Sequence, residues 1–179
     1  DNVDDHGGTY GDWSRFYEES FSWNPPVESN NESLIRTWSS QYLAIANANQ
    51  VLDALGKMEM TDKLRAAKGE ALICRAYAHF VLVNIFCQQY DPNYPDDMGI
   101  PYMEKAETEL DPKYERGTVA EVYAKIEKDI EEGLPLIDDA IYSVPKYHFN
   151  RKAAYSFAAR FFLYYQKWDK AAEYASEAL

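Results

Sequence analysis

The chain has 179 residues, 46% of them hydrophobic, which is enough to enclose one sizeable core. Its formal net charge of −12 argues against nucleic acid and anionic membrane surfaces as partners, because both are bound by clustered Lys and Arg. No apolar run approaches the roughly 18–20 residues that are needed to cross a bilayer.

The first 32 residues carry no helical periodicity, yet they hold many aromatic side chains. Gly7-Gly8 and Pro25-Pro26 punctuate this segment and indicate turns. A disordered tail would be poor in aromatic residues. We therefore predict that residues 1–32 form an ordered aromatic loop segment and that residues 33–179 form a helical lobe, within a single domain.

Apolar residues spaced by three and four positions predict about five main helices in the rest of the chain. The predicted ranges are 33–55, 62–87, 118–133, 151–166 and 168–179. Thr61, Thr118 and Asn150 are the expected N-caps, and Thr118 forms a capping box with Glu121. The long connection over residues 88–117 is of a kind that is uncommon unless it is functional or packed as a lobe.

The last two predicted helices are joined by a tight turn at Lys167 and carry small residues where two helices approach closely. This pairing resembles a tetratricopeptide repeat unit, and the first two helices would form a longer hairpin, with the third between the pairs. We predict an all-α fold of tetratricopeptide-like right-handed helical hairpins with long aromatic-rich loops. Because the last helix reaches Leu179 without a capping glycine or proline, we expect the chain to be a fragment of a longer protein.

The sequence contains no motif for a metal, a cofactor or a catalytic nucleophile, so we expect none of them. The oxygen-rich stretch over residues 91–97 lacks the spacing of a calcium loop and is interpreted as solvated turns. Cys74 and Cys87 lie 13 residues apart on one predicted helix, a span of about 20 Å, and cannot form a disulfide.

The most distinctive stretch runs from Gly69 to Phe80 within the second predicted helix. Its glycine indicates a close helix crossing, and its charged residues indicate an ion pair within the packed core. Glu70 and Arg75 are five positions apart and do not face one another well, so their partners are expected on other helices. The expected structural network comprises Asn49, Glu70, Arg75, Asp129 and Arg160.

Five segments, in order along the chain, carry a family resemblance. They are Trp38 to Asn49, Gly69 to Phe80, Gly99-Ile100-Pro101, Arg116 to Ile130, and Ala158 to Ala175. Together they resemble the SusD/RagB family of nutrient-binding lipoproteins on the outer membrane surface of Bacteroidetes. Members are commonly several hundred residues long. The chain therefore resembles the helical scaffold portion, without the signal peptide, the lipid-bearing cysteine and the C-terminal half.

The resemblance implies non-enzymatic glycan or nutrient binding at the extracellular face of the outer membrane. It also implies a SusC-like TonB-dependent transporter as partner and a lipid anchor in the full-length protein. A competing hypothesis is a helical-repeat adaptor for peptides or proteins. Two clear helix pairs are fewer than the roughly three repeats that such an array needs. No constellation of residues supports an enzyme.

Aromatic and amide side chains of the N-terminal segment are the candidate glycan ligands. A flat aromatic ring covers the apolar face of a pyranose, while amides bond its hydroxyl groups. The candidates are Trp13, Tyr17, Trp23, Asn24 and Asn30. The alternative is that these aromatic side chains fix the loop to the domain.

Overall fold

The computed structural model describes residues 19, 21–24, 33–109 and 112–179. Contacts divide the chain into two compact units, Asp1–Tyr42 and Leu43–Leu179, and each is described by itself. The division after Tyr42 falls inside the helix Leu34–Leu55. The boundary predicted after residue 32 lies next to residues that the structure does not describe. That boundary stays a prediction.

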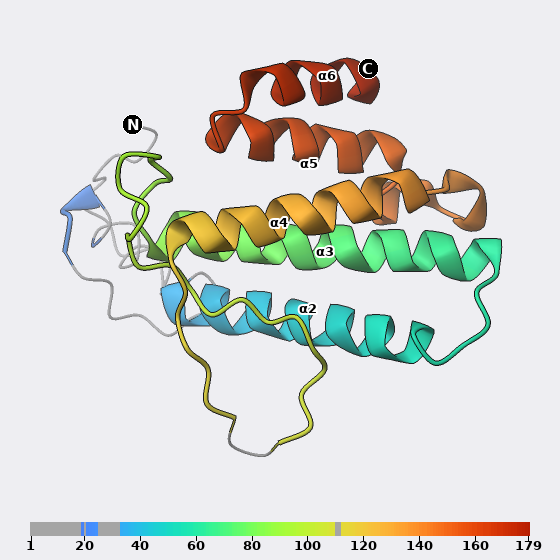
Figure 1. Ribbon diagram of the computed structural model, residues 1–179, viewed down its shortest axis with the longest axis horizontal. Helices are drawn as coiled ribbons and strands as arrows, with labels where there is room; N and C mark the ends of the chain where they lie inside the picture. The colour runs from blue at the N-terminus through green and yellow to red at the C-terminus, as the bar shows by residue number, and fades with distance from the viewer. Residues whose placement is uncertain (1–18, 20, 25–32, 110–111) are drawn as a thin grey trace, which may run out of the picture. The chain divides into compact units, whose positions relative to one another are not determined.

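Five labelled α-helices account for most of the described residues (Figure 1). They are α2 (Leu34–Leu55), α3 (Asp62–Phe86), α4 (Val119–Gly133), α5 (Arg151–Tyr164) and α6 (Trp168–Ala178). Short 3-10 helices follow α4 at Leu134–Leu136, Asp139–Ile141 and Pro145–Tyr147. The described part of the chain holds no strand, only an isolated antiparallel bridge between Met98 and Thr118. The all-α prediction is confirmed.

The helices begin where their capping residues predict. The Thr61 hydroxyl accepts a hydrogen bond from the Leu64 amide at 3.3 Å. The Thr118 hydroxyl accepts from the Glu121 amide at 3.1 Å, and the Glu121 carboxylate accepts in return from the Thr118 amide at 2.9 Å. Asn150 caps α5 in the same way. Each cap satisfies an amide that has no partner within the helix.

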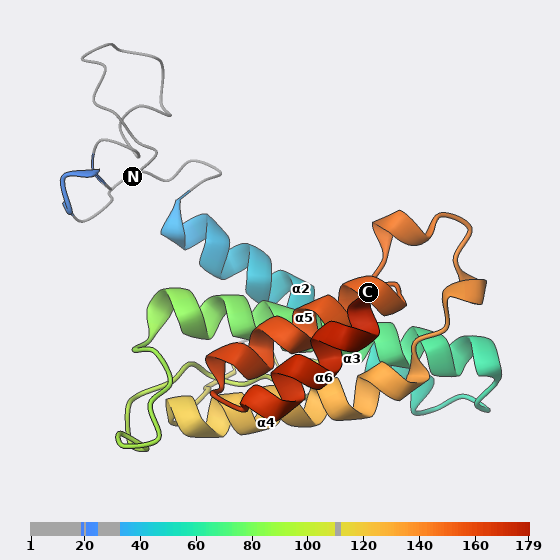
Figure 2. The ribbon, with the colours of Figure 1, turned by 90° about the horizontal axis from the view of Figure 1, so that it is seen from above.

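Helices α3 and α4 pack as a close pair and lie side by side in Figures 1 and 2. A Cβ atom added to Gly69 would lie 2.8 Å from the Gly133 carbonyl oxygen and 2.8 Å from the Leu136 Cβ. Only a residue without a side chain fits there, so the predicted close crossing exists. The other close pair is α5 with α6. Helix α4 thus packs closely on α3, while α2 is joined to α3 by the hydrogen bond from Arg75 Nη1 to Asn49 Oδ1 at 2.9 Å.

Helix α3 is the central helix of the second unit, with twelve buried residues. By length and composition α3 is also apolar enough to cross a membrane. The prediction that no apolar segment approaches the length of a membrane span is therefore wrong when length and mean hydropathy are the criteria. However, 61% of its apolar window is buried inside the protein, as in the core helix of a globular domain. Both cysteines lie on or beside α3, and both are free and partly exposed.

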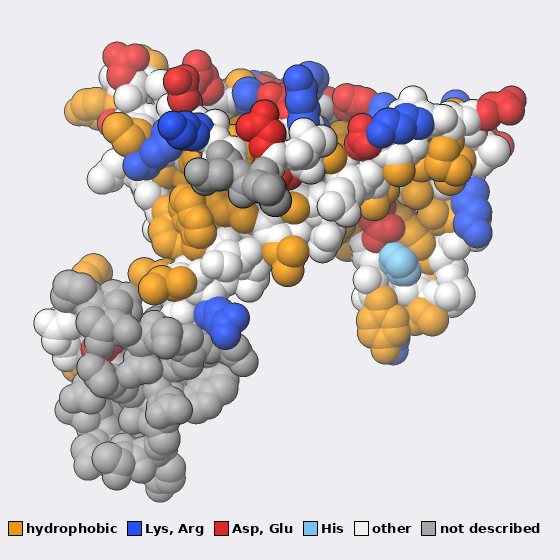
Figure 3. Space-filling view, turned by 90° about the horizontal axis from the view of Figure 1, so that it is seen from below, with side chains coloured by type: hydrophobic (Ala, Val, Ile, Leu, Met, Phe, Trp, Pro, Cys, Tyr) orange, Lys and Arg blue, Asp and Glu red, His pale blue; other side chains and the backbone are white. Residues whose placement is uncertain are grey.

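Partly exposed ion pairs connect α4 to its neighbours. Lys68 pairs with Glu132 at 2.6 Å and Lys167 with Glu127 at 2.6 Å. Figure 3 shows acidic and basic side chains interspersed on the face in view, not gathered by sign. The described residues on that face form no basic patch of the kind that binds polyanions.

Candidate functional site

The structure describes two of the five predicted glycan ligands. Trp13, Tyr17 and Asn30 lie outside the described residues. Trp23 and Asn24 are both exposed, and the Trp23 side chain is 94% accessible to solvent. The exposed indole offers a flat apolar surface, and the two roles considered for it, glycan binding and fixing the loop to the domain, both stay predictions.

Trp23 also has an unusual backbone conformation. Its φ angle is 57°, in the left-handed region, and the Asn24 amide donates a hydrogen bond to the Glu19 carbonyl at 2.9 Å. This arrangement is a common helix ending in which the left-handed residue is usually glycine. A bulky side chain there costs about 1 kcal/mol or more. Such local strain is often retained for function.

The structure brings three of the five predicted network residues together. Arg75 donates two hydrogen bonds to the Asp129 carboxylate, from Nε and from Nη2, each at 2.7 Å. Its Nη1 donates to Asn49 Oδ1 at 2.9 Å. The Arg75 and Asp129 side chains are only 9% and 3% exposed. The pair is therefore a buried, bidentate ion pair that links α2, α3 and α4.

The other two predicted members lie elsewhere. Glu70 accepts hydrogen bonds from His148 Nδ1 at 2.9 Å and from the Phe149 amide at 3.2 Å, so it holds the segment that leads into α5. Arg160 is exposed on the surface of α5. Five positions on a helix turn Glu70 away from Arg75, and this rotation separates the two into different contacts.

The network also holds an irregular stretch, residues 100–105, here called the strap. Asn49 Nδ2 donates to the carbonyl oxygens of Met103 at 2.9 Å and of Lys105 at 3.1 Å. Arg75 Nη1 donates to the Glu104 carbonyl at 3.1 Å. Side chains of two helices thus bind the main chain of the strap, in place of the neighbouring strand that an extended segment normally pairs with.

His79 and Tyr102 complete this attachment. The Met103 amide donates to His79 Nε2 at 3.1 Å, so the other ring nitrogen carries the proton and donates to the Arg75 carbonyl at 2.9 Å. The Tyr102 ring stacks on His79 with centroids 3.7 Å apart, and its hydroxyl donates to Asp129 at 2.6 Å. His79 is therefore neutral and structural.

The burial of these groups shifts their pKa values. Burial, together with the neighbouring Arg75 charge, lowers the pKa of His79 to about 3. Burial and the Asp129 charge raise the pKa of Tyr102 well above its usual range. Burial disfavours the Arg75 cation, but its hydrogen bonds to Asp129 and the charge of that carboxylate outweigh this effect and raise the pKa of Arg75. All three groups keep one protonation state at neutral pH, which suits a scaffold rather than acid–base catalysis.

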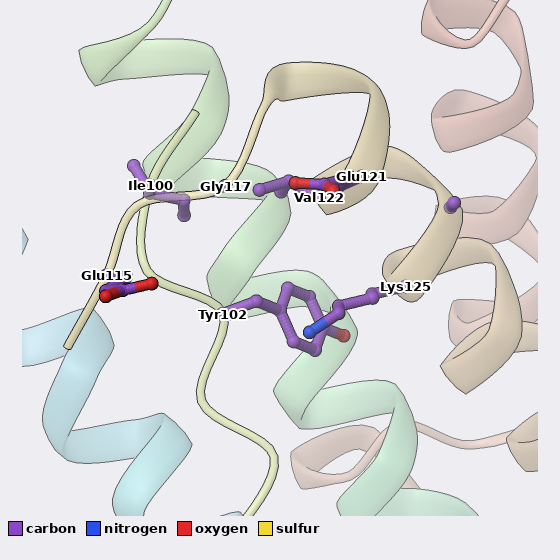
Figure 4. A pocket seen from close by; sticks show the side chains of 8 residues that line it. Ile100, Tyr102, Glu115, Gly117, Glu121, Val122 and Lys125 are labelled. Carbon is purple, nitrogen blue, oxygen red and sulfur yellow. The ribbon is translucent and has the colours of Figure 1, made fainter. Parts of the chain in front are cut away.

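A pocket of about 340 Å³ opens between the strap and the first turns of α4 (Figure 4). Its lining combines apolar, aromatic and charged side chains. The lining residues are Ile100, Tyr102, Glu115, Gly117, Glu121, Val122, Ala124 and Lys125. The sequence argument missed this pocket. The length of the connection over residues 88–117 was the one signal that pointed to it.

The comparisons with known proteins agree with this architecture. Residues 3–163 match a SusD-like family whose description is "starch-binding associating with outer membrane". No curated protein matches the sequence. Among solved structures, a SusD-like carbohydrate binding protein from Bacteroides vulgatus is 28% identical with a TM-score of 0.68, and the match covers 81% of this chain and 31% of that one.

Two further solved structures are similar. A laminarin binding SusD-like protein is 25% identical with a TM-score of 0.64, over 79% of this chain and 29% of that one. A SusD superfamily protein from Bacteroides fragilis is 24% identical with a TM-score of 0.75, over 92% and 38% of the two chains, and supports the fold alone. The chain spans about a third of the length of these solved relatives. It belongs to the SusD-like family, as the five ordered segments predicted.

Proposed function

We propose that this chain contributes to non-enzymatic glycan binding at the outer membrane. The observation that carries the proposal is the family match over residues 3–163, because that family is described as starch-binding. Two of the solved relatives are named for carbohydrate or laminarin binding. The exposed indole of Trp23 supports the proposal with a group of suitable chemistry.

In the proposed mechanism the Trp23 ring covers the apolar face of one sugar residue, and Asn24 bonds its hydroxyl groups. Trp13, Tyr17 and Asn30 are proposed to extend the same surface. Covering about 80 Å² of apolar surface would contribute ~2 kcal/mol, which corresponds to a roughly 30-fold change in affinity. The net charge of −12 favours neutral over acidic glycans.

Binding isotherms of the full-length protein against neutral glucans, xylans and mannans test this proposal. Trp23→Ala is expected to weaken binding of the best ligand by roughly 30-fold. Trp168→Ala is the matched control, since Trp168 is 58% exposed on α6, and it should bind as the parent does. Mass spectrometry of the recovered glycan should find no cleavage. Affinity for peptides with none for glycans would favour the helical-repeat adaptor instead.

We also propose that the full-length protein is lipid-anchored on the extracellular face and works with a SusC-like TonB-dependent transporter. The support is the family description, which names the outer membrane, and the resemblance of the segments within residues 38–179. Cell fractionation, surface proteolysis and co-purification of the tagged full-length protein test it. Recovery in the cytoplasm, or purification without any outer membrane transporter, would contradict it.

A further inference from the structure

We propose that the pocket between the strap and α4 is a second ligand site, which takes one neutral saccharide residue. The ligand class rests on the proposed function, but the residues belong to the second unit and not to the aromatic segment. The pocket has a volume of about 340 Å³, at the lower end of the roughly 300–1,000 Å³ of small-molecule sites. That space suits a single ring, not a chain.

The floor of the pocket is held rigidly by the buried network. Tyr102 is fixed by its hydrogen bond to Asp129 and by its stack on His79. The next residue, Met103, is tied to the helices through both its amide and its carbonyl group. A site whose walls are already ordered loses little entropy when a ligand binds.

The polar groups of the pocket match a polyol. In Figure 4 Glu115 and Lys125 lie on opposite sides of the pocket, and the Lys125 ammonium extends toward the Tyr102 ring. Glu121 uses Oε2 to accept the Thr118 amide, which leaves Oε1 for a ligand. Carboxylates accept from sugar hydroxyl groups, and an ammonium donates to hydroxyl and ring oxygens. Ile100 and Val122 also line the pocket, but each is only 1% exposed, so they form its buried base.

The charges select a neutral ring. Lys125 already pairs with Glu104 at 2.8 Å and lies over the Tyr102 ring, 5.4 Å from its centroid. Glu115 and Glu121 then leave a local excess of negative charge, which repels uronic acids and sulfated sugars. An amino sugar would have to compete with the Lys125 ammonium for the same carboxylates and aromatic face.

Methyl NMR of the full-length protein, labelled at isoleucine and valine, tests this site. Titration with methyl β-D-glucopyranoside should shift the Ile100 and Val122 signals in a saturable way. The Ile130 signal, from the same buried face of α4 but about two turns beyond Val122 and outside the lining of the pocket, should not move. Glu115→Gln and Lys125→Met should each weaken the response by roughly tenfold, because each removes a hydrogen bond to a charged group. Lys128→Met, an exposed change on the same helix, is the matched control.

The outcomes separate this site from the aromatic segment. Trp23→Ala should leave the Ile100 and Val122 shifts intact even where it abolishes oligosaccharide binding. Shifts that persist in a protein with no oligosaccharide affinity would uphold the pocket and remove the proposed aromatic site. The inference would be overturned if the glucoside caused no shift, or if Glu115→Gln and Lys125→Met responded to it as strongly as the parent protein. A stronger response of the parent protein to methyl glucuronoside or methyl glucosaminide than to the glucoside would also overturn it.

Discussion

Asp129→Asn tests the buried network most directly, because it removes one charge and keeps the shape of the side chain. The Asp129 side chain is 3% exposed and accepts three hydrogen bonds of 2.6–2.7 Å, two from Arg75 and one from Tyr102. Burial disfavours the Arg75 cation, and the hydrogen bonds and charge of this carboxylate offset that effect and raise the pKa of Arg75. Removing one partner of a buried ion pair costs about 3–5 kcal/mol, out of a total stability of about 5–15 kcal/mol.

The second partner gives the prediction its internal control. Arg75→Met alone should also cost several kcal/mol, because it leaves the Asp129 carboxylate buried with only the Tyr102 hydroxyl. The double variant leaves no buried charge. It should therefore lose at least about 2 kcal/mol less than the sum of the single variants.

Urea unfolding at pH 7, followed by far-ultraviolet circular dichroism, measures these free energies. Asp53→Asn is the surface control, since Asp53 pairs with Lys57 at exposed positions, and it should change stability by less than about 0.5 kcal/mol. A loss below about 1 kcal/mol in Asp129→Asn, or single-variant losses that simply add, would refute the account of a buried and coupled pair.

Three other predictions follow from single residues. Burial lowers the folded-state pKa of His79 to about 3 from 6.5, so the unfolded chain takes up its proton first on acidification. The stability from neutral His79 is complete above pH 6.5 and is lost toward pH 3, at about 1.4 kcal/mol per pH unit. The stability difference between the parent and His79→Gln should therefore shrink as the pH falls, and a constant difference would contradict this. Gly69→Ala should cost about 1–3 kcal/mol in a urea titration, because its Cβ would lie 2.8 Å from the Gly133 oxygen. Gly56→Ala, whose Cβ would meet only atoms at 3.5 Å, should be near neutral. Trp23→Gly should slow hydrogen exchange at the next amide relative to Trp23→Ala, because glycine relieves about 1 kcal/mol of left-handed strain, and equal exchange rates would show that no strain is present.

The helices were predictable because their signals are local. The Thr61 and Thr118 caps act within three residues, so the sequence alone places the starts of α3 and α4. The close crossing at Gly69 was also expected, since glycine destabilises a helix interior and is usually kept there only where another helix packs closely. Its partner Gly133 is the last residue of the predicted helix 118–133, but the sequence of neither helix shows that these two glycines meet.

The partners of Arg75 were only partly predictable. Asp129 was a candidate because a buried cation requires an anion. Arg160 was a candidate for the same kind of reason, but it lies on the exposed surface of α5. Charge balance limits which residue types pair, while the rotation of each helix decides which of them meet.

The strap and its pocket could not be predicted from the sequence. Three of the hydrogen bonds that hold the strap end on the main-chain carbonyl groups of residues 103–105. Every residue has such a carbonyl group, so these acceptors cannot be recognised from the amino-acid sequence. The stack of Tyr102 on His79 likewise joins two residues whose types are common in cores.

The buried charges of Arg75 and Asp129 contribute more to the positioning of the strap than to the stability of the fold. A hydrophobic replacement of a buried ion pair is often as stable as the pair itself, so stability alone gives little reason to keep Arg75 and Asp129. An apolar contact would hold the strap against the helices without fixing its register. Hydrogen bonds from Arg75 and Asn49 to successive carbonyl groups allow one register only. That register places Tyr102 between His79 and Lys125, and so it determines the shape of the pocket floor.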